Sequence, residues 1–529
     1  MIYSRFVSSG EPCVRGLLFL VSTLISALIL IPMMASAANS DETKPDAGKA
    51  LTIAFSACDH SYKTPGDAEC GRLLVAENPA NPDGRKISLN VMRIPALTNT
   101  AADPLFVVVG GPGGAAVQSA PQYLPYFRDL QKKRDIIFVD QRGTGDSNGL
   151  QCPLGENQLS PMKDAEKRAR IEELAVDCVA GLDANLEFYT TPYAVQDLEQ
   201  VRRALGYQQV NMWGVSYGTR VILAYMHTYP AVLRTAVLDS LAPVSIQLPR
   251  YVAEDGSRAL ELVFRQCERD ATCLQTYGDL RSGWLDLLNR LNGQPRTITL
   301  SHPRSQQPVA VYLSASTLSS WVRLTLYSRD LAPLIPKAIQ RAMNDDFSLF
   351  GSIALLAAED INEHLSQGMQ TAVLCAEDRQ YPKVDNGEVY GGAPNKNENQ
   401  LLLQLDTAET LSRICQYFPE GDLPETYFTP VHSDVPTLLL SGDYDPVTPP
   451  AWGERVAQNL SNSRHIVVPG AHHGVTMQGC VARLVTEFIE EGSLDALKAD
   501  CAEAIQPRAF FIDGAGPALL SEPVVGDQL

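Results

Sequence analysis

Three separate stretches of the 529-residue sequence contain the residue types of a catalytic serine centre. Ser216 lies between two glycines in GVSYG (214–218), Asp445 lies in GDYDPVTP, and His473 lies in GAHHG. A serine hydroxyl is a weak nucleophile at neutral pH, so it needs a histidine to accept its proton and a carboxylate to orient that histidine. We therefore predict that Ser216, Asp445 and His473 form a catalytic triad for acyl transfer.

Two members of this triad have a neighbour that could replace them. Asp443 precedes Asp445 by two residues and is an alternative acid, although the Asp-Pro-Val-Thr-Pro turn that begins at Asp445 favours the later residue. His472 adjoins His473, and because adjacent loop residues point in different directions, we expect only one to face the serine. We predict that His473, which directly precedes a glycine, is the base. Alternatively, both imidazoles are ordinary surface groups.

The glycine-rich stretch GGPGG at 110–114 suits an oxyanion hole, because residues without side chains let backbone N–H groups approach a substrate. The predicted donors are the amides of Gly111 and of Tyr217, the residue after the nucleophile. A loose dinucleotide-binding pattern, GxGxxA, also starts at Gly111. Pro112 inside the turn and the hydrolytic residues elsewhere argue against that alternative. No Gly-Lys-Ser/Thr follows, which excludes a phosphate-binding P-loop.

Alternating strands and helices are expected to bring these residues together. The apolar patterns predict strands over 86–94, 104–109, 134–141, 208–214 and 234–241, and helices over 123–133, 191–205 and 219–230. Thr191 can cap its helix, and Pro192 suits the first helical position. This order implies a mainly parallel sheet covered on both faces. Ser216 then falls at a strand-to-helix turn, as a nucleophile elbow requires.

The chain is long enough for an α/β core and a second unit. From about residue 249 to 430 the pattern becomes helical, with one hairpin predicted around 297–313. Strand patterns return just before Asp445 and just before His473, which would place both at the same sheet edge as Ser216. We predict an α/β-hydrolase fold with a mostly parallel central sheet and a large, mainly helical lid inserted after the strand near residue 240. The predicted parts are a signal peptide (1–37), the first part of the core (38–248), the lid (249–430), and the second part of the core with a C-terminal segment (431–529).

Composition and the N-terminus limit the location and the partners. A formal net charge of −18 argues against nucleic acid or an anionic membrane as the main partner. Arg5 and Arg15, the apolar run 16–34 and Ala35-Ser36-Ala37 form the pattern of a cleaved export signal, which predicts a periplasmic or extracellular protein. The run approaches membrane-spanning length, so an uncleaved anchor is the alternative.

Ten cysteines remain after Cys13 leaves with the signal, and an exported chain with an even number of cysteines is expected to form disulfides. Connectivity cannot be deduced from sequence, and pairing in chain order is the local hypothesis. That hypothesis joins Cys58 with Cys70, Cys152 with Cys178, Cys267 with Cys273, Cys375 with Cys415, and Cys480 with Cys501. A metal site is not favoured, because there is no Cys-x-x-Cys. We expect no metal or organic cofactor.

Several motifs in order resemble one enzyme family. GGPGG, DQRGTGDS (140–147), WGVSYGTR, LSGDYDPVTPP and GAHHG together resemble the α/β-hydrolase serine aminopeptidases: the prolyl iminopeptidases and especially the secreted tripeptidyl-aminopeptidase-like proteins. The resemblance implies Ser216 as nucleophile, Asp445 as acid and His473 as base. The stretch 479–501 is similar to the C-terminal segment of that subgroup and supports the Cys480 to Cys501 pair.

The resemblance also implies recognition of a free α-amine, for which an acidic group is suited. Glu377 and Asp378 in LCAEDRQ lie where the family has an acidic residue after a cysteine; alternatively they are a solvated charge pair. Asp140 and Arg142 are expected to fix their loop under the site. The predicted function is an exported serine hydrolase that cleaves amino acids or short peptides, including tripeptides, from free peptide N-termini. The alternatives are a carboxylic-ester hydrolase with the same triad and a catalytically silent binding protein.

Overall fold

A computed structural model describes residues 52–98, 102–152, 161–248, 250–378, 401–405, 407–513 and 516. The predicted export signal at 1–37 lies outside the described residues. Within them, every helix is too short or too polar to cross a membrane.

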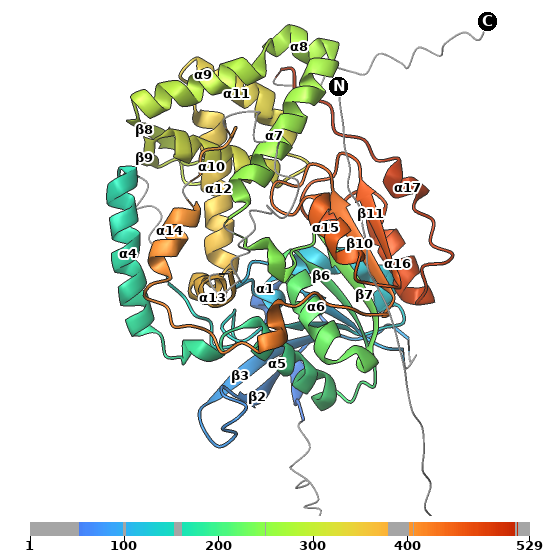
Figure 1. Cartoon of the computed structure of the whole chain (residues 1–529). Helices are drawn as coiled ribbons and strands as arrows, with labels where there is room; N and C mark the ends of the chain where they lie inside the picture. The colour runs from blue at the N-terminus through green and yellow to red at the C-terminus, as the bar shows by residue number, and fades with distance from the viewer. Residues whose placement is uncertain are drawn as a thin grey trace, which may run out of the picture. The chain divides into compact units, whose positions relative to one another are not determined.

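A nine-stranded sheet lies at the centre of the described structure, in the order β1-β2-β3-β5-β4-β6-β7-β10-β11 (Figure 1). The pairings from β1 to β5 are antiparallel, and all pairings from β5 to β11 are parallel. The predicted mostly parallel sheet is therefore confirmed. The strands are β1 (Phe55–Ala57), β2 (Glu69–Ala76), β3 (Lys86–Ile94), β4 (Leu105–Val108), β5 (Ile136–Val139), β6 (Val210–Val215), β7 (Leu233–Asp239), β10 (Thr437–Gly442) and β11 (Ser463–Val468).

Burial explains why these segments form parallel strands. Every residue of β4, β5, β6 and β10 is buried, which is the pattern of strands covered on both faces. Parallel strands all end at the same edge of a sheet, so the loops after β6, β7, β10 and β11 meet there. Ser216 follows β6, Asp445 follows β10 and His473 follows β11.

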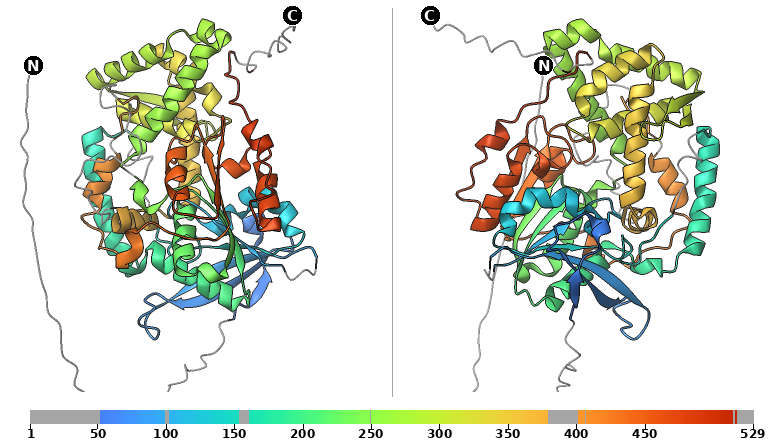
Figure 2. Two further views of the ribbon diagram at one scale, coloured as in Figure 1. Left: turned by 45° about the vertical axis from the view of Figure 1, so that its right-hand side comes forward. Right: turned by 180° about the vertical axis from the view of Figure 1, so that it is seen from behind.

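Helices cover both faces of the sheet (Figures 1 and 2). One face packs against α1, α2 and α16 in one apolar cluster, and the other packs against α5 and α6 in a second cluster. The α-helices outside the region between β7 and β10 are α1 (Ala116–Tyr123), α2 (Arg128–Gln131), α4 (Asp164–Gly181), α5 (Thr191–Ala204), α6 (Tyr217–Thr228), α15 (Pro450–Ala457), α16 (Val481–Glu491) and α17 (Asp500–Glu503).

The segment between β7 and β10, hereafter the insertion, is mainly helical. Its first part, α7 to α12 with the β8–β9 hairpin, forms most of a separate apolar cluster that includes Trp284, Leu318 and Phe350. The later part of the insertion is divided: Leu402 and Leu403 join that cluster, whereas Met369 and Cys375 pack on the main core. The elements are α7 (Val252–Arg269), α8 (Ala271–Tyr277), α9 (Leu280–Gly293), β8 (Arg296–Ser301), β9 (Pro308–Leu313), α10 (Ala315–Leu326), α11 (Ile335–Met343), α12 (Ser348–His364), α13 (Gln367–Val373), a π-helix (Leu374–Asp378), α14 (Thr407–Ile414) and the short 3-10 helix η8 (Glu425–Phe428).

All five disulfides join cysteines that are consecutive in the chain after Cys13. They are Cys58–Cys70, Cys152–Cys178, Cys267–Cys273, Cys375–Cys415 and Cys480–Cys501. The pairing in chain order that the sequence suggested is the pairing in the structure.

Two local predictions differ from the structure. The single helix expected over 123–133 is a 3-10 turn (Leu124–Phe127) followed by the short α2, because Pro125 has no N–H to continue the helix that precedes it. The N-cap of α5 is Thr190, not Thr191, although Pro192 does lie in the first turn. The Thr191 hydroxyl instead hydrogen-bonds the Tyr217 hydroxyl at 2.7 Å.

Candidate active site

Ser216 occupies a sharp turn between β6 and α6. Its φ of 57° lies in the left-handed region, which costs free energy for a residue with a side chain and is a feature of nucleophile elbows. Both flanking positions must be glycine, because a side chain there would clash with neighbouring atoms. A Cβ on Gly218 would lie 2.1 Å from the Val108 carbonyl oxygen, and one on Gly214 would lie 2.7 Å from the Gly218 carbonyl oxygen. The GxSxG spacing therefore has a packing reason in this chain.

Asp239 and Ser240, at the end of β7, hold the serine turn and the histidine loop next to each other. The Ser216 amide donates to the Asp239 carbonyl at 2.9 Å. The Asp239 carboxylate accepts from the amides of Val475 and Thr476, both at 2.7 Å, and the Ser240 hydroxyl accepts from the Gly474 amide at 2.8 Å. The loop that contains His473 is thus fixed to the same two residues as the serine turn.

His473 and Asp445 form a hydrogen-bonded ion pair. The distance from His473 Nδ1 to Asp445 Oδ2 is 2.8 Å, so Nδ1 carries the proton and Nε2 keeps its lone pair. Asp445 is fully buried, and it also accepts hydrogen bonds from the amides of Val447 and Thr448 and from the Thr448 hydroxyl. This arrangement orients the imidazole and leaves its other nitrogen available as a base.

The pair changes the acidity of both groups. Burial alone would raise the pKa of Asp445, but His473 and the Thr448 and Val447 amides outweigh it and hold the pKa of this carboxyl well below its ordinary value. Burial lowers the pKa of His473, yet Asp445 and Asp239 raise it above the ordinary value. The charged carboxylate favours the imidazolium that a base must become during catalysis.

The contacts of the two alternative residues differ from those of the triad residues. Asp443 accepts a hydrogen bond from the Gly470 amide at 2.7 Å and shapes the turn. His472 Nδ1 lies 2.6 Å from the Leu326 carbonyl oxygen, so it donates to the insertion, and burial lowers its pKa to about 4. The structure therefore brings Asp445 and His473 together and does not bring Asp443 or His472 into that pair. No hydrogen bond joins Ser216 to His473 in the described structure.

The GGPGG loop lies against the serine. A Cβ on Gly110 would be 2.8 Å from the Ser216 Cβ, so only a glycine allows this approach. Gly111 is exposed, and neither its amide nor that of Tyr217 donates a hydrogen bond to another described residue. Tyr217 is the first residue of α6, where backbone donors lack partners inside the helix. Within the described residues, both predicted oxyanion donors therefore lack an internal hydrogen-bond acceptor.

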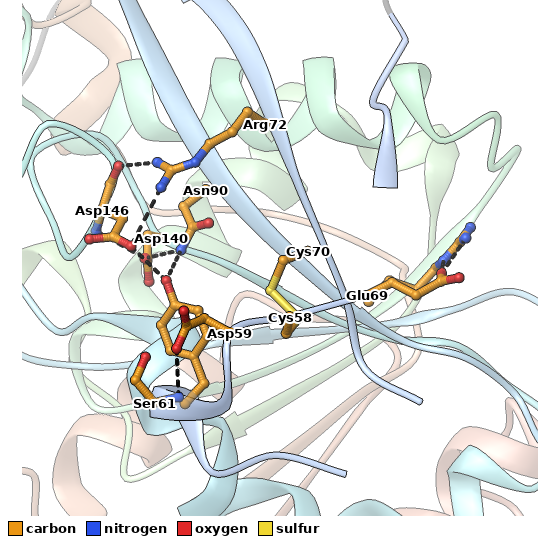
Figure 3. Close-up of a disulfide and its surroundings, with 11 residues drawn as sticks. Cys58, Asp59, Ser61, Glu69, Cys70, Arg72, Asn90, Asp140 and Asp146 are labelled. Carbon is orange, nitrogen blue, oxygen red and sulfur yellow. Dashed lines mark hydrogen bonds and ion pairs between the residues drawn. A yellow bond between two sulfur atoms is a disulfide. The ribbon is translucent and has the colours of Figure 1, made fainter. Parts of the chain in front are cut away.

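The polar residues of the DQRGTGDS loop form buried contacts within the protein, and these contacts hold the loop in place. Asp140 is fully buried and accepts from the Val117 and Asp146 amides. It also accepts from the Asn90 side chain, as Figure 3 shows. Arg142 is also fully buried and makes a bidentate pair with Asp197 at 2.7 and 2.8 Å. Figure 3 also shows the Cys58–Cys70 disulfide next to this network. The expectation that these residues fix the loop agrees with these contacts.

Glu377 and Asp378 are buried and share one cation, so they are not a solvated pair. Arg220 Nη1 lies 3.1 Å from Glu377 and 2.9 Å from Asp378. Glu377 also accepts from the Thr191 amide and the Tyr427 hydroxyl, and Asp378 accepts from the Leu248 amide. Burial raises the pKa of Asp378. Their predicted role in binding a substrate amine stays a prediction.

The residues that orient the triad were missed in the sequence. Asp239, Ser240 and Thr448 make the bonds described above, and Tyr327 of the insertion lies edge-on to His473 with ring centroids 5.2 Å apart. A signal existed only for Asp239, a carboxylate at the end of an apolar strand that shares the edge with Ser216. In the described residues, no group of three or more His, Cys, Asp or Glu is placed to hold a metal ion.

Comparisons with known proteins identify the family of the fold. The pattern of the alpha/beta hydrolase fold family matches residues 103–479, and the chain belongs to that family. It is 24% identical over 481 residues to the serine protease Hip1 of Mycobacterium tuberculosis, covering 83% of this chain and 88% of the relative. It is 24% identical over 489 residues to the tripeptidyl aminopeptidase of Streptomyces coelicolor, covering 85% and 86% respectively. A 144-residue stretch is 29% identical to a probable proline iminopeptidase of the same organism, covering 27% and 34%.

Proposed function

We propose that this protein is an exported serine peptidase that releases amino acids or short peptides, tripeptides included, from the free N-termini of peptides. The observation that carries the proposal is the buried Asp445–His473 pair, fixed through Asp239 and Ser240 to the strained turn of Ser216. Relatives named serine protease and tripeptidyl aminopeptidase over more than four-fifths of the chain support a peptide substrate.

The proposed reaction proceeds through an acyl-enzyme. His473 Nε2 takes the proton of the Ser216 hydroxyl as its oxygen attacks the scissile carbonyl, and the Asp445 carboxylate stabilises the imidazolium. The amides of Gly111 and Tyr217 donate to the negative oxygen of the tetrahedral intermediate. When that intermediate collapses, the C–N bond breaks and His473 gives its proton to the leaving amine. His473 then takes a proton from an entering water, whose oxygen attacks the acyl carbonyl. The ester C–O bond breaks, and His473 returns the proton to the Ser216 oxygen.

Glu377 and Asp378 are proposed to attract the substrate's α-ammonium group. Two carboxylates face the single cation of Arg220, so this cluster keeps one excess negative charge if all three are ionised. Asp378 is 8% exposed and Glu377 is 0% exposed, so Asp378 is the group closer to solvent. A buried negative charge attracts an ammonium group more strongly than a solvated one does.

The disulfide bonds support the proposal that the protein is exported. Five disulfides are present in the described residues, and disulfides persist mainly in oxidising compartments. The predicted signal peptide fits the same location. The protein is purified from the cells and from the secreted fraction of an expressing bacterium, and both samples are sequenced from the N-terminus. We expect the secreted protein to begin after Ala37.

The substrate class is tested with chromogenic anilides of one, two and three residues, each with a free and with an acetylated N-terminus, alongside simple acyl esters. We expect the free amines to be preferred by about tenfold or more in kcat/KM, because a charge-assisted hydrogen bond is lost on acetylation. Asp378→Asn should lower that preference, and Asp129→Asn, at an exposed position on α2, should not. Faster turnover of acetylated anilides or of esters would instead indicate an endopeptidase or an esterase.

A further inference from the structure

The last turn of α10 lies directly against the two histidines. The Leu326 carbonyl accepts the hydrogen bond from His472, and the ring of the next residue, Tyr327, meets the His473 ring at 5.2 Å and 66°. Arg323 lies one turn earlier on the same helix, and its Nη2 donates to the Tyr327 hydroxyl at 2.8 Å. The guanidinium carbon is 5.2 Å from the Tyr327 ring centroid. Arg323 therefore belongs to the insertion and is linked to the candidate base through Tyr327.

Arg323 has no anionic partner among the described residues, in contrast to the buried Arg142 and Arg220. Arg142 pairs with Asp197, and Arg220 pairs with Glu377 and Asp378. The only hydrogen bond of Arg323 in the described part is to an uncharged tyrosine, and its Nε is buried without any partner. A partly buried guanidinium is costly without a carboxylate, which suggests that the anion comes from a bound molecule.

The position of this cation is unfavourable for catalysis unless it is neutralised. Burial and the charge of Arg323 both lower the pKa of His473, whereas Asp445 and Asp239 raise it. A cation near the imidazole opposes the proton transfer that would make His473 an imidazolium. A substrate carboxylate paired with Arg323 would remove that penalty at the moment the substrate is bound.

The geometry of the proposed reaction indicates which part of the substrate lies next to Arg323. His473 must hand its proton to the leaving amine, so the leaving group lies against the imidazole. Tyr327 packs edge-on to that ring and Arg323 packs on Tyr327, so both lie on the leaving-group side of the imidazole. We propose that Arg323 binds a carboxylate on the residue that follows the scissile bond, which makes it a specificity-determining residue. This inference rests on the proposed peptidase function.

The carboxylate can come from two sources. It is the α-carboxylate when the leaving group is a single C-terminal amino acid, so that the substrate is one residue longer than the released fragment. Otherwise it is the side chain of an aspartate or glutamate that follows the scissile bond in a longer peptide. Both present the same planar anion to the guanidinium fork.

The test uses the full-length protein and unblocked alanine peptides of two to five residues, each as the free acid and as the carboxamide. A second pair of longer peptides, amidated at the C-terminus, has Glu or Gln after the scissile bond. We expect the acid to be preferred about 10- to 100-fold in kcat/KM in at least one pair, the range for a charge-assisted hydrogen bond. The pair with the larger ratio identifies the source of the carboxylate.

Arg323→Gln assigns the preference to this residue. Both substrates of a pair are measured on the same sample, so the ratio of their kcat/KM values does not depend on how much of the variant is correctly folded. The ratio should fall toward 1 in Arg323→Gln and be partly retained in Arg323→Lys. It should be unchanged in Arg265→Gln, an exposed arginine on α7 of the insertion whose partner is Glu261.

Three results would contradict the proposed role of Arg323. A wild-type ratio near 1 while peptides are cleaved overturns the inference and leaves the proposed function standing. A preference that persists in Arg323→Gln also overturns it. If the wild type cleaves none of these peptides although a fluorophosphonate labels it, the peptidase function is wrong and the inference fails with it.

Discussion

At the scale of single residues, the candidate site depends on which carboxylate faces the histidine. Asp445 is fully buried and accepts four hydrogen bonds including that from His473, whereas Asp443 accepts from the Gly470 amide. Two aspartates separated by one residue thus have different tasks. Asp445 holds the imidazole of His473, and Asp443 ties the turn after β10 to the loop after β11.

This difference predicts opposite results for two conservative substitutions. Asp445→Asn should reduce kcat by about 10⁴-fold, because an amide favours the wrong imidazole tautomer and cannot stabilise the imidazolium. Asp443→Asn keeps the oxygen that accepts from Gly470, so kcat should change less than about threefold. Steady-state turnover of a free-amine anilide measures both. Equal losses in the two variants would mean that the acid is wrongly assigned.

If His473 is the base, as proposed, the pH dependence of kcat/KM reports its protonation. The base must be neutral to act, and its pKa is raised mainly by Asp445 against the effect of burial. Activity should therefore fall as pH drops through a midpoint above 6.5, the ordinary histidine value. In His472→Gln the midpoint should stay in place, because His472 bonds the insertion and not the acid. A midpoint below 6.5 would contradict the Asp445 contact.

The sequence alone was sufficient for Ser216, Asp445 and His473 as candidates, since each has a recognisable motif. It was insufficient for the residues that orient them. Thr448 was visible only as part of a turn, and the fact that its hydroxyl reaches both Asp445 and His473 depends on the fold. Arg220 could not be predicted as the partner of Glu377, because 157 residues separate them in the chain.

At the scale of elements, the site depends on how closely β4, β6 and α6 approach one another. Gly218 allows this approach, since its Cα faces the Val108 carbonyl at the end of β4. No flexible side chain can move aside there, because the neighbouring atoms belong to the backbone. The second glycine of GxSxG is therefore a packing requirement of the fold as well as a motif.

Gly218→Ala is expected to lower the free energy of unfolding by about 1–3 kcal/mol or more, since the added methyl would overlap backbone atoms. Gly181→Ala, at the end of α4, is the matched control. Nothing lies within 4 Å of its added Cβ, and alanine is the better helix former, so stability should be unchanged or higher by up to about 1 kcal/mol. Urea unfolding midpoints compare the two. A neutral Gly218→Ala would refute the close approach.

Elements were predictable where apolar periodicity was strong. The strand predicted over 86–94 coincides with β3, and the strand predicted over 208–214, which leads to Ser216, lies within two residues of β6. The helix predicted over 123–133 failed at Pro125, where local backbone chemistry outweighs the amphipathic pattern. The sequence pattern also could not show that the insertion divides between its own apolar cluster and the main core, because long-range packing decides this.

At the scale of the whole molecule, disulfides close loops of very different length. Cys375–Cys415 spans 40 residues and fixes the segment that holds Glu377 and Asp378, whereas Cys267–Cys273 spans 6 residues within the α7–α8 region. In the chain-entropy model a longer closed loop removes more freedom from the unfolded chain. The longer bridge should therefore contribute more to stability.

Replacing both cysteines of each bridge by serine tests this ranking. The loss should be about 4 kcal/mol for the Cys375–Cys415 pair and about 2 kcal/mol for the Cys267–Cys273 pair, from loop length alone. Thermal unfolding midpoints of the two double variants provide the comparison. The reverse order would show that local packing, not chain entropy, determines the contribution of these bridges.

The central claim is that Ser216 is a nucleophile activated by His473, and covalent labelling tests it most directly. Native protein treated with a fluorophosphonate, digested and analysed by mass spectrometry should have the adduct on the peptide that contains Ser216, and heat-denatured protein should have none. Ser216→Ala should remain folded and unlabelled, and Asp445→Asn should be labelled far more slowly than the wild type. Labelling of Ser216→Ala at the wild-type rate, or an adduct on another serine of the native protein, would contradict the account.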